Sequence, residues 1–206
     1  MPYRVLIVED QEMPRQLFEI YVRSAKEYEL VGSIVHAQLA VDFCQSGKVD
    51  LVLMDVLTGL GENRLDAAEE IKKRYPRVKI IIVTSMPESG YLARARQIGV
   101  DSFWYKEAQK EPILEVMNRT MAGERIYPDA PPLVRIGNAT NREFSERELE
   151  VLRELITGDS NTEIGKRLGI APSTVKFHVQ NMLQKTGMHT RTELAAIARS
   201  LGIAIK

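Results

Sequence analysis

Acidic, hydroxyl and amine side chains lie at the ends of short apolar runs in the N-terminal half. Glu9 and Asp10 follow the first run, Asp55 follows the third, Thr84 ends the fourth, and Lys106 follows the fifth. Packed carboxylates repel one another unless a cation lies between them. A hard divalent ion such as Mg²⁺ takes oxygen ligands of this kind. An aspartate beside Mg²⁺ and a lysine is suited to attack a phosphoryl group, so these residues predict an aspartyl-phosphate site.

Strands are needed to bring these residues together, and the apolar pattern of residues 1–125 predicts them. Short Val- and Ile-rich runs alternate with amphipathic stretches, a pattern typical of βα units around a parallel sheet. The carboxyl ends of parallel strands meet at one sheet edge, where such folds bind ligands. The expected strands are Arg4–Val8, Leu30–Val35, Asp50–Met54, Lys79–Thr84 and Asp101–Tyr105, and the expected helices are Met13–Lys26, Ala37–Gln45, Leu65–Arg74, Ser89–Ile98 and Lys110–Met121. The fold class is therefore α/β, a doubly wound (βα)₅ parallel sheet.

The motifs that carry the chemistry are Val5 to Asp10, Leu51 to Asp55, Ile81 to Thr84 and Phe103 to Lys106. Together they closely resemble the receiver domain of two-component response regulators, over residues 3–122. The resemblance implies a flavodoxin-like receiver fold and phosphorylation of Asp55 by a histidine kinase. It also implies Mg²⁺ held by Glu9, Asp10, Asp55 and the Leu57 carbonyl, with switching carried by Thr84, Lys106 and the aromatic Phe103.

Several positions depart from the receiver pattern. The loop at residues 56–63 reads Val-Leu-Thr-Gly-Leu-Gly-Glu-Asn, where receivers usually have Met-Pro and a later Gly. Ser85 replaces a smaller residue, and Glu107 stands where many receivers have Pro. Phe103 has no hydroxyl where many receivers carry Tyr. These departures leave open a regulator of the same fold that works without phosphate.

Residues 126–140 contain three prolines and Gly137 without a helical period, and are therefore expected to be a linker. Residues 141–206 are expected to be all helical, in four segments. The first begins with a capping box at Ser145 and Glu148 and ends at Gly158. The second begins after Ser160 or Asn161 and ends at Gly169; the third runs from Pro172 to Gly187, and the fourth from about Arg191 to Leu201.

The ordered segments Ser145 to Leu152, Ser160 to Ile170, Ser173 to Val179, Lys185 to Gly187 and Arg191 to Ala195 resemble the LuxR-type helix-turn-helix of the NarL/FixJ family, over residues 143–202. In the third helix Val175, Val179, Met182 and Leu183 form the inward stripe. The remaining faces offer donors and an apolar side chain suited to the major groove. By resemblance, the base contacts are Lys176, Phe177 and Gln180. The phosphate contacts are Asn161, Ser173, Thr174, Asn181, Lys185 and Thr190.

The net charge of zero does not argue against DNA binding, because the charges are unevenly distributed along the chain. The 206 residues are 44% hydrophobic, as in a globular protein, and carry 28 basic and 28 acidic side chains. Residues 1–125 carry −2, residues 141–159 carry −3, and residues 160–206 carry +5. The positive charge of residues 160–206 therefore favours binding to the negatively charged DNA backbone. With Cys44 as the single cysteine and no long apolar segment, we expect a cytoplasmic protein without a membrane span.

The sequence thus predicts a non-enzymatic transcription regulator with a receiver at residues 1–125, a linker at 126–140 and a DNA-binding domain at 141–206. Its expected partners are a cognate histidine kinase and promoter half-sites, which it would bind as a homodimer when phosphorylated. An aspartyl-phosphate hydrolase is a weaker alternative, because Leu57 stands where its general acid would be. A small-molecule-sensing regulator with the same DNA-binding domain is disfavoured by the acidic cluster.

Overall fold

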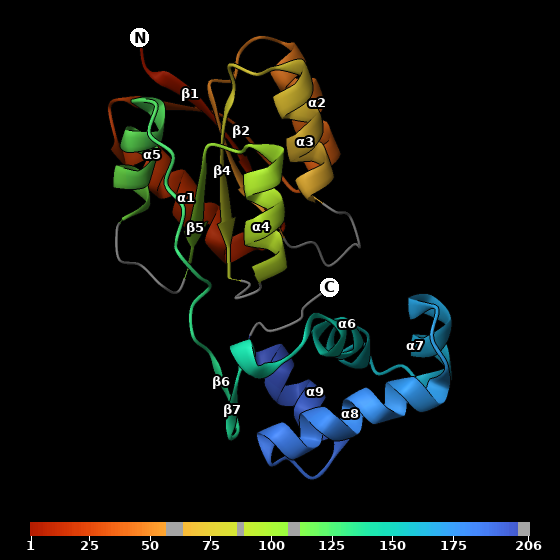
Figure 1. The fold of residues 1–206 in the computed structure, drawn as a ribbon. Coiled ribbons are helices and arrows are strands. Elements are labelled where there is room, and N and C mark those ends of the chain that lie inside the picture. Colours follow the sequence, from red (N-terminus) through yellow and green to blue (C-terminus); the bar gives the residue numbers. More distant parts are fainter. Residues whose placement is uncertain (57–63, 86–88, 107–111, 202–206) are drawn as a thin grey trace. The chain divides into compact units, whose positions relative to one another are not determined.

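The computed structural model describes residues 1–56, 64–85, 89–106 and 112–201. Its N-terminal strands form a parallel sheet in the order β2-β1-β3-β4-β5 (Figure 1). The strands are β1 (Tyr3–Val8), β2 (Tyr28–Ile34), β3 (Leu51–Asp55), β4 (Lys79–Thr84) and β5 (Ser102–Tyr105). This order is the flavodoxin-like doubly wound order, so the predicted fold class is confirmed.

Helices cover both faces of the sheet (Figure 1). They are α1 (Glu12–Ser24), α2 (Ala37–Gln45), α3 (Arg64–Arg74), α4 (Ser89–Ile98) and α5 (Ile113–Met121). Val5 and Ile7 of β1 pack in one core with α1 and α5, whereas Leu6 and Val8 pack in another with α2, α3 and α4. Because successive strand side chains point to opposite faces, one apolar run supplies both cores.

The predicted elements of this domain lie within two residues of the observed ones, except at the start of the last helix. That helix was expected from Lys110, which lies outside the described residues. Pro112 is extended, with φ −60° and ψ 145°, and α5 begins at Ile113. The sequence pattern misplaces this start because Pro112 lies at the helix N-cap rather than inside the helix.

The second part of the chain contains the four predicted helices: α6 (Glu146–Leu155), α7 (Asn161–Leu168), α8 (Pro172–Thr186) and α9 (Arg191–Ser200). Ser145 and Glu148 form the predicted capping box, and Ser160 and Glu163 form a second one at α7. The glycines that end α7 and α8 adopt the left-handed conformation. Within the part of the chain that the structure describes, no helix has the length and apolarity needed to cross a membrane.

The segment at residues 126–140, expected to be a linker, contains ordered structure at both ends. Ile126 pairs with Ser102 of β5, and the Tyr127 hydroxyl donates to the Val100 carbonyl at 2.5 Å. Further on, β6 (Arg135–Ile136) and β7 (Ala139–Thr140) form a hairpin that leads into a 3₁₀ turn, η1 (Asn141–Glu143). Each compact unit therefore takes part of this segment, with the division between residues 130 and 131.

The turn of this hairpin packs against the end of α8. The Asn138 N–H donates to the Thr186 carbonyl at 2.9 Å. Gly137 has φ +59°, and a Cβ at this position would lie 2.2 Å from the Thr186 carbonyl oxygen. Only glycine allows this approach, which attaches the hairpin to the helix predicted to read DNA.

Candidate functional site

The ends of β1 and β3 bring three carboxylates together. Glu9, Asp10 and Asp55 each offer an oxygen, and these oxygens lie within 4.8 Å of one another. Asp55 is 2% exposed and Glu9 is 1% exposed, because β3 and β1 are inner strands covered on both faces. The predicted convergence of these acids is therefore confirmed in position. We call these three residues the carboxylate cluster.

Lys106 enters the carboxylate cluster from the end of β5. Its Nζ lies 2.6 Å from Glu9 Oε2 and 3.5 Å from Asp55 Oδ1. The Lys106 backbone N–H donates to the Thr84 carbonyl at 2.9 Å, which places Lys106 beside the end of β4. Thr84 itself is fully buried there. The strand ends thus place an amine and a hydroxyl-bearing residue at the sheet edge that holds the carboxylates.

The environment of Asp55 favours its protonated form. Burial raises the pKa of the Asp55 carboxyl to about 7, Lys106 and Arg64 oppose this rise, and Glu9 and Asp10 add to it. An aspartate that titrates near neutral pH and faces two cations is typical of a functional site. When ionised, the Asp55 carboxylate would be a nucleophile flanked by the Lys106 and Arg64 cations.

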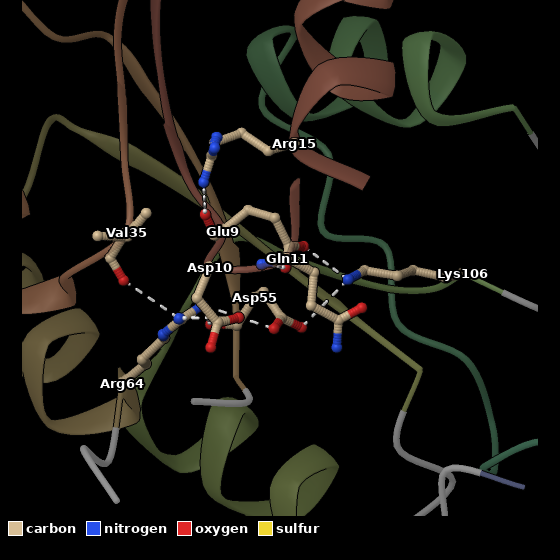
Figure 2. A network of polar contacts seen from close by, with 8 residues as sticks. All are labelled: Glu9, Asp10, Gln11, Arg15, Val35, Asp55, Arg64 and Lys106. Carbon is tan, nitrogen blue, oxygen red and sulfur yellow. Dashed lines mark hydrogen bonds and ion pairs between the residues drawn. The ribbon is translucent and has the colours of Figure 1, made fainter. Parts of the chain in front are cut away.

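One residue of the site was not predicted. Arg64, the first residue of α3, extends into the carboxylate cluster from the side opposite Lys106 (Figure 2). Its NH1 lies 3.5 Å from Asp55 Oδ2, and its NH2 lies 3.3 Å from Asp10 Oδ1. The only sequence signal was indirect, because the loop that departs from the receiver pattern ends just before Arg64.

Two further predictions concern the neighbourhood of the carboxylate cluster. The Leu57 carbonyl, expected as a metal ligand, lies outside the described residues. Phe103 is 1% exposed in the core beneath α4, and its ring centroid lies 5.0 Å from that of Tyr105. The switching role of Phe103 stays a prediction.

The candidate DNA-reading helix has the predicted division of faces. Val175, Val179 and Met182 are buried, and Leu183 is partly buried. On the opposite side Lys176 and Gln180 are exposed, and Phe177 is 58% exposed. This face therefore offers two hydrogen-bond donors, Lys176 and Gln180, beside an apolar ring, and such groups can contact base edges in the major groove.

The residues expected to contact phosphates fall into two groups. Ser173 and Thr174 lie in the first turn of α8, where backbone N–H groups favour anions, and Asn181 lies further along that helix. The others have contacts within the domain. Asn161 Oδ1 accepts from Arg191, the Thr190 hydroxyl accepts from the Glu193 N–H at the start of α9, and Lys185 pairs with Glu148.

The Lys185 pair is expected to contribute mainly to stability. Lys185 Nζ lies 2.7 Å from the buried Glu148 Oε2 and 2.8 Å from the Glu143 carbonyl. Burial alone would raise the pKa of Glu148, but hydrogen bonds from Lys185 and Ser145 outweigh burial and hold this pKa below its usual range. Lys185→Ala should lower the free energy of unfolding of the helical domain by about 2 kcal/mol at pH 7, measured by denaturant unfolding.

The sign of the pH dependence follows from the lowered Glu148 pKa. The stabilisation from ionised Glu148 is fully present above the pKa of a glutamate in the unfolded chain, about 4.3. It is lost as the pH falls through the lower pKa of Glu148 in the folded protein. Lys176→Ala removes the same charge from an exposed position on α8 and should leave stability unchanged. Equal stability of the two variants at pH 7 would contradict the prediction.

Comparison with known families identifies both parts of the chain. The family described as "Response regulator receiver domain" matches residues 5–118. The family described as "Bacterial regulatory proteins, luxR family" matches residues 142–204. The two matches cover the sheet domain with its carboxylate cluster and the helical domain with α8.

Relatives of full length share this organisation. The response regulator protein VraR of Staphylococcus saprophyticus is 32% identical over 204 residues, which are 96% of this chain and 97% of that protein. VraR of Staphylococcus aureus is also 32% identical over 204 residues. Among solved structures, RcsB of Salmonella enterica bound to a promoter aligns with TM-score 0.56 and 16% identity, covering 98% of this chain and 100% of that one. A LuxR-family DNA-binding response regulator from Staphylococcus aureus aligns with TM-score 0.53 and 26% identity, over 58% of this chain and 98% of that one.

Proposed function

Since this chain belongs to the two-component response regulators with a LuxR-type DNA-binding domain and is a transcription regulator, we propose that phosphorylation of Asp55 controls its DNA binding. The phosphoacceptor domain would be residues 1–125, and the DNA-binding domain residues 141–206. One observation carries the proposal: a buried aspartate at a strand end lies beside Lys106 and two further carboxylates. The same chain carries a helix with an exposed donor and aromatic face.

The chain's own residues suit phosphoryl transfer to Asp55. A carboxylate oxygen of ionised Asp55 would attack the phosphorus of a kinase phosphohistidine, and the P–N bond would break. The imidazole nitrogen that leaves would take up a proton from water. Lys106, fixed by Glu9, would neutralise charge on the transferred phosphoryl group. We also propose that the Thr84 hydroxyl donates to a phosphoryl oxygen and that Phe103 moves in response.

The carboxylate cluster also fits a divalent ion. Three oxygens from Glu9, Asp10 and Asp55 within 4.8 Å are hard ligands of the kind that Mg²⁺ takes. These residues would hold Mg²⁺, with the Leu57 carbonyl as a further proposed ligand. When bound, the ion supplies positive charge that offsets the oxygens of the phosphoryl group.

For the DNA-binding part we propose that Lys176, Phe177 and Gln180 read base edges and that the protein binds paired half-sites as a homodimer. Structures of RcsB dimers bound to DNA support this arrangement by analogy of fold. The pairing helix would be α9. A regulator that binds promoter DNA acts where the DNA lies, so we propose the cytoplasm as its location, with a histidine kinase as its partner and no enzymatic turnover of its own.

Phosphorylation is tested by replacing the acceptor. Asp55→Asn should abolish incorporation of a phosphoryl group from acetyl phosphate, because an amide is not nucleophilic enough to attack phosphorus. Intact mass spectrometry measures the gain of one phosphoryl group. Asp42→Asn, at an exposed position of α2, should be phosphorylated like the parent protein. Phosphorylation of Asp55→Asn to the parent level would refute the site.

A second candidate function is a regulator of the same fold that works without phosphate. Arg64 favours it, because a cation already lies among the carboxylates. Sizing and selection of DNA from a random duplex library, each with and without beryllofluoride, separate the two functions. Unchanged oligomeric state and unchanged DNA affinity would favour the phosphate-independent regulator.

A further inference from the structure

Arg64 has an unusual position for a charged side chain. Its side chain is 0% exposed, and its guanidinium faces Asp55 and Asp10 at the base of the carboxylate cluster (Figure 2). NH1 also lies 3.3 Å from the Asp55 carbonyl, and NH2 lies 3.2 Å from the Val35 carbonyl. A buried guanidinium is tolerated only where negative charge and acceptors compensate for lost solvation. The carboxylate cluster provides that compensation.

The charges of the pocket explain why a second cation is needed. Glu9, Asp10 and Asp55 contribute three negative charges when ionised, and Lys106 offsets one of them at close range to Glu9. Like charges at this separation raise the free energy of the folded state. Arg64 offsets a second charge on the side that Lys106 does not contact, toward Asp10.

Arg64 contacts the same residues that a divalent ion would require. It contacts Asp10 Oδ1 and Asp55 Oδ2, which belong to two of the three carboxylates of the cluster. A Mg²⁺ ion binds its oxygen ligands at about 2.1 Å, so the carboxylates must close around it. The Arg64 guanidinium already neutralises part of the negative charge of these oxygens and occupies the space beside them, so it competes with Mg²⁺ for the site.

The Arg64 contacts are also loose. Its ion pairs are 3.3 and 3.5 Å long, whereas charge-assisted hydrogen bonds of this kind are usually about 2.7–2.9 Å. Arg64 Nε has no hydrogen-bond partner among the residues that the structure describes. Lys106, by contrast, lies 2.6 Å from Glu9. Of the two cations, Arg64 is therefore the one that can be displaced.

We propose that Arg64 is the resident cation of the carboxylate cluster, and that a divalent metal ion binds there only by displacing the Arg64 guanidinium. This inference rests on the proposed function, since it concerns the metal site of the proposed phosphoacceptor pocket. It predicts a full-length protein whose affinity for Mg²⁺ is limited by its own arginine.

The test compares Mg²⁺ binding by the parent protein and Arg64→Gln. Without the competing cation, the Kd of Arg64→Gln for Mg²⁺ should be lower by about tenfold or more. Calorimetry measures the Kd, and the fluorescence of Trp104, the single tryptophan, provides a second readout. Arg74→Gln is the matched control: it removes the same charge from α3 at an exposed position paired with Glu70, and its Kd should equal that of the parent.

A variant that folds poorly without metal still decides the question. The Tm of Arg64→Gln should then rise steeply with MgCl₂, while the Tm of the parent and of Arg74→Gln rises little. A Kd for Arg64→Gln equal to or above that of the parent, or a Tm that MgCl₂ does not restore, would overturn the proposal.

Phosphorylation by acetyl phosphate is scored separately by intact mass. A parent protein that takes up no phosphoryl group refutes the proposed function, whatever the Mg²⁺ affinities are. A parent protein that is phosphorylated, while both variants bind Mg²⁺ equally, refutes the role of Arg64 alone.

Discussion

Replacing Gly165 by alanine is expected to destabilise the helical domain by about 2–3 kcal/mol and to weaken DNA binding at least about tenfold. Gly165 lies in the middle of α7 and faces the turn between α7 and α8. A Cβ at this position would lie 2.6 Å from the Ile170 carbonyl oxygen and 3.4 Å from Pro172 N. Both neighbours are backbone atoms, so the strain cannot be relieved by a side-chain rotation.

The displacement would affect DNA recognition because of where the strained turn leads. Ile170 N–H donates to the Gly165 carbonyl at 2.9 Å, which fixes the turn directly before α8 begins at Pro172. Moving the Ile170 carbonyl moves the first turn of the helix that carries Lys176 and Phe177. Each well-placed base contact is worth about 1–3 kcal/mol, so a small shift is costly.

Denaturant unfolding followed by circular dichroism measures the stability loss, and fluorescence anisotropy with a selected duplex measures binding. Gly90→Ala is the control, because Gly90 is a helical glycine of α4 with open space around its Cβ position. That change should stabilise the chain by about 0.5–1 kcal/mol. Parent-like unfolding and DNA affinity of Gly165→Ala would contradict the prediction.

The strand-end residues of the site were predictable because their positions depend on local pattern and topology alone. The apolar runs identified β1, β3 and β5, and parallel pairing then placed Asp10, Asp55 and Lys106 at one edge. The helices of the second domain were equally well marked. Ser145 and Ser160 each precede a glutamate by three residues, and both capping boxes form.

Arg64 could not be predicted in the same way. Its sequence neighbours suggest an exposed residue at the start of a helix, and its burial depends on partners contributed by the ends of β1 and β3. The hairpin of residues 135–140 was missed for a different reason. Its strands are two residues long, too short for an alternating pattern, and its stability comes from the contact of Gly137 and Asn138 with Thr186.

Asp55→Asn is expected to increase the free energy of unfolding of the receiver at pH 8 by about 2–4 kcal/mol in the absence of metal. The reason is that burial raises the pKa of Asp55 from 3.8 to about 7. Below about pH 4 the carboxyl is protonated in both the folded and the unfolded protein. As the pH rises from 4 to 7, the unfolded chain releases this proton and the folded chain retains it, so the parent loses stability. An asparagine has no proton to release at these pH values, and the difference between the two proteins should grow over this range and then stay constant.

Asp101→Asn is a control at another buried aspartate, where the pKa shift and the expected change in stability have the opposite sign. Asp101 is buried, but it accepts hydrogen bonds from Lys72, Lys79 and the Ile80 N–H at 2.9–3.0 Å. Burial alone would raise the pKa of Asp101; these bonds outweigh it and hold the pKa below its usual range. Its stabilising contribution is present above the unfolded pKa and lost at lower pH, so Asp101→Asn should destabilise the protein at pH 8. Thermal and denaturant unfolding from pH 4 to pH 8 compare the variants. A loss of stability in Asp55→Asn at pH 8 would contradict the prediction, because it would mean that Lys106 and Arg64 outweigh the burial of the Asp55 charge.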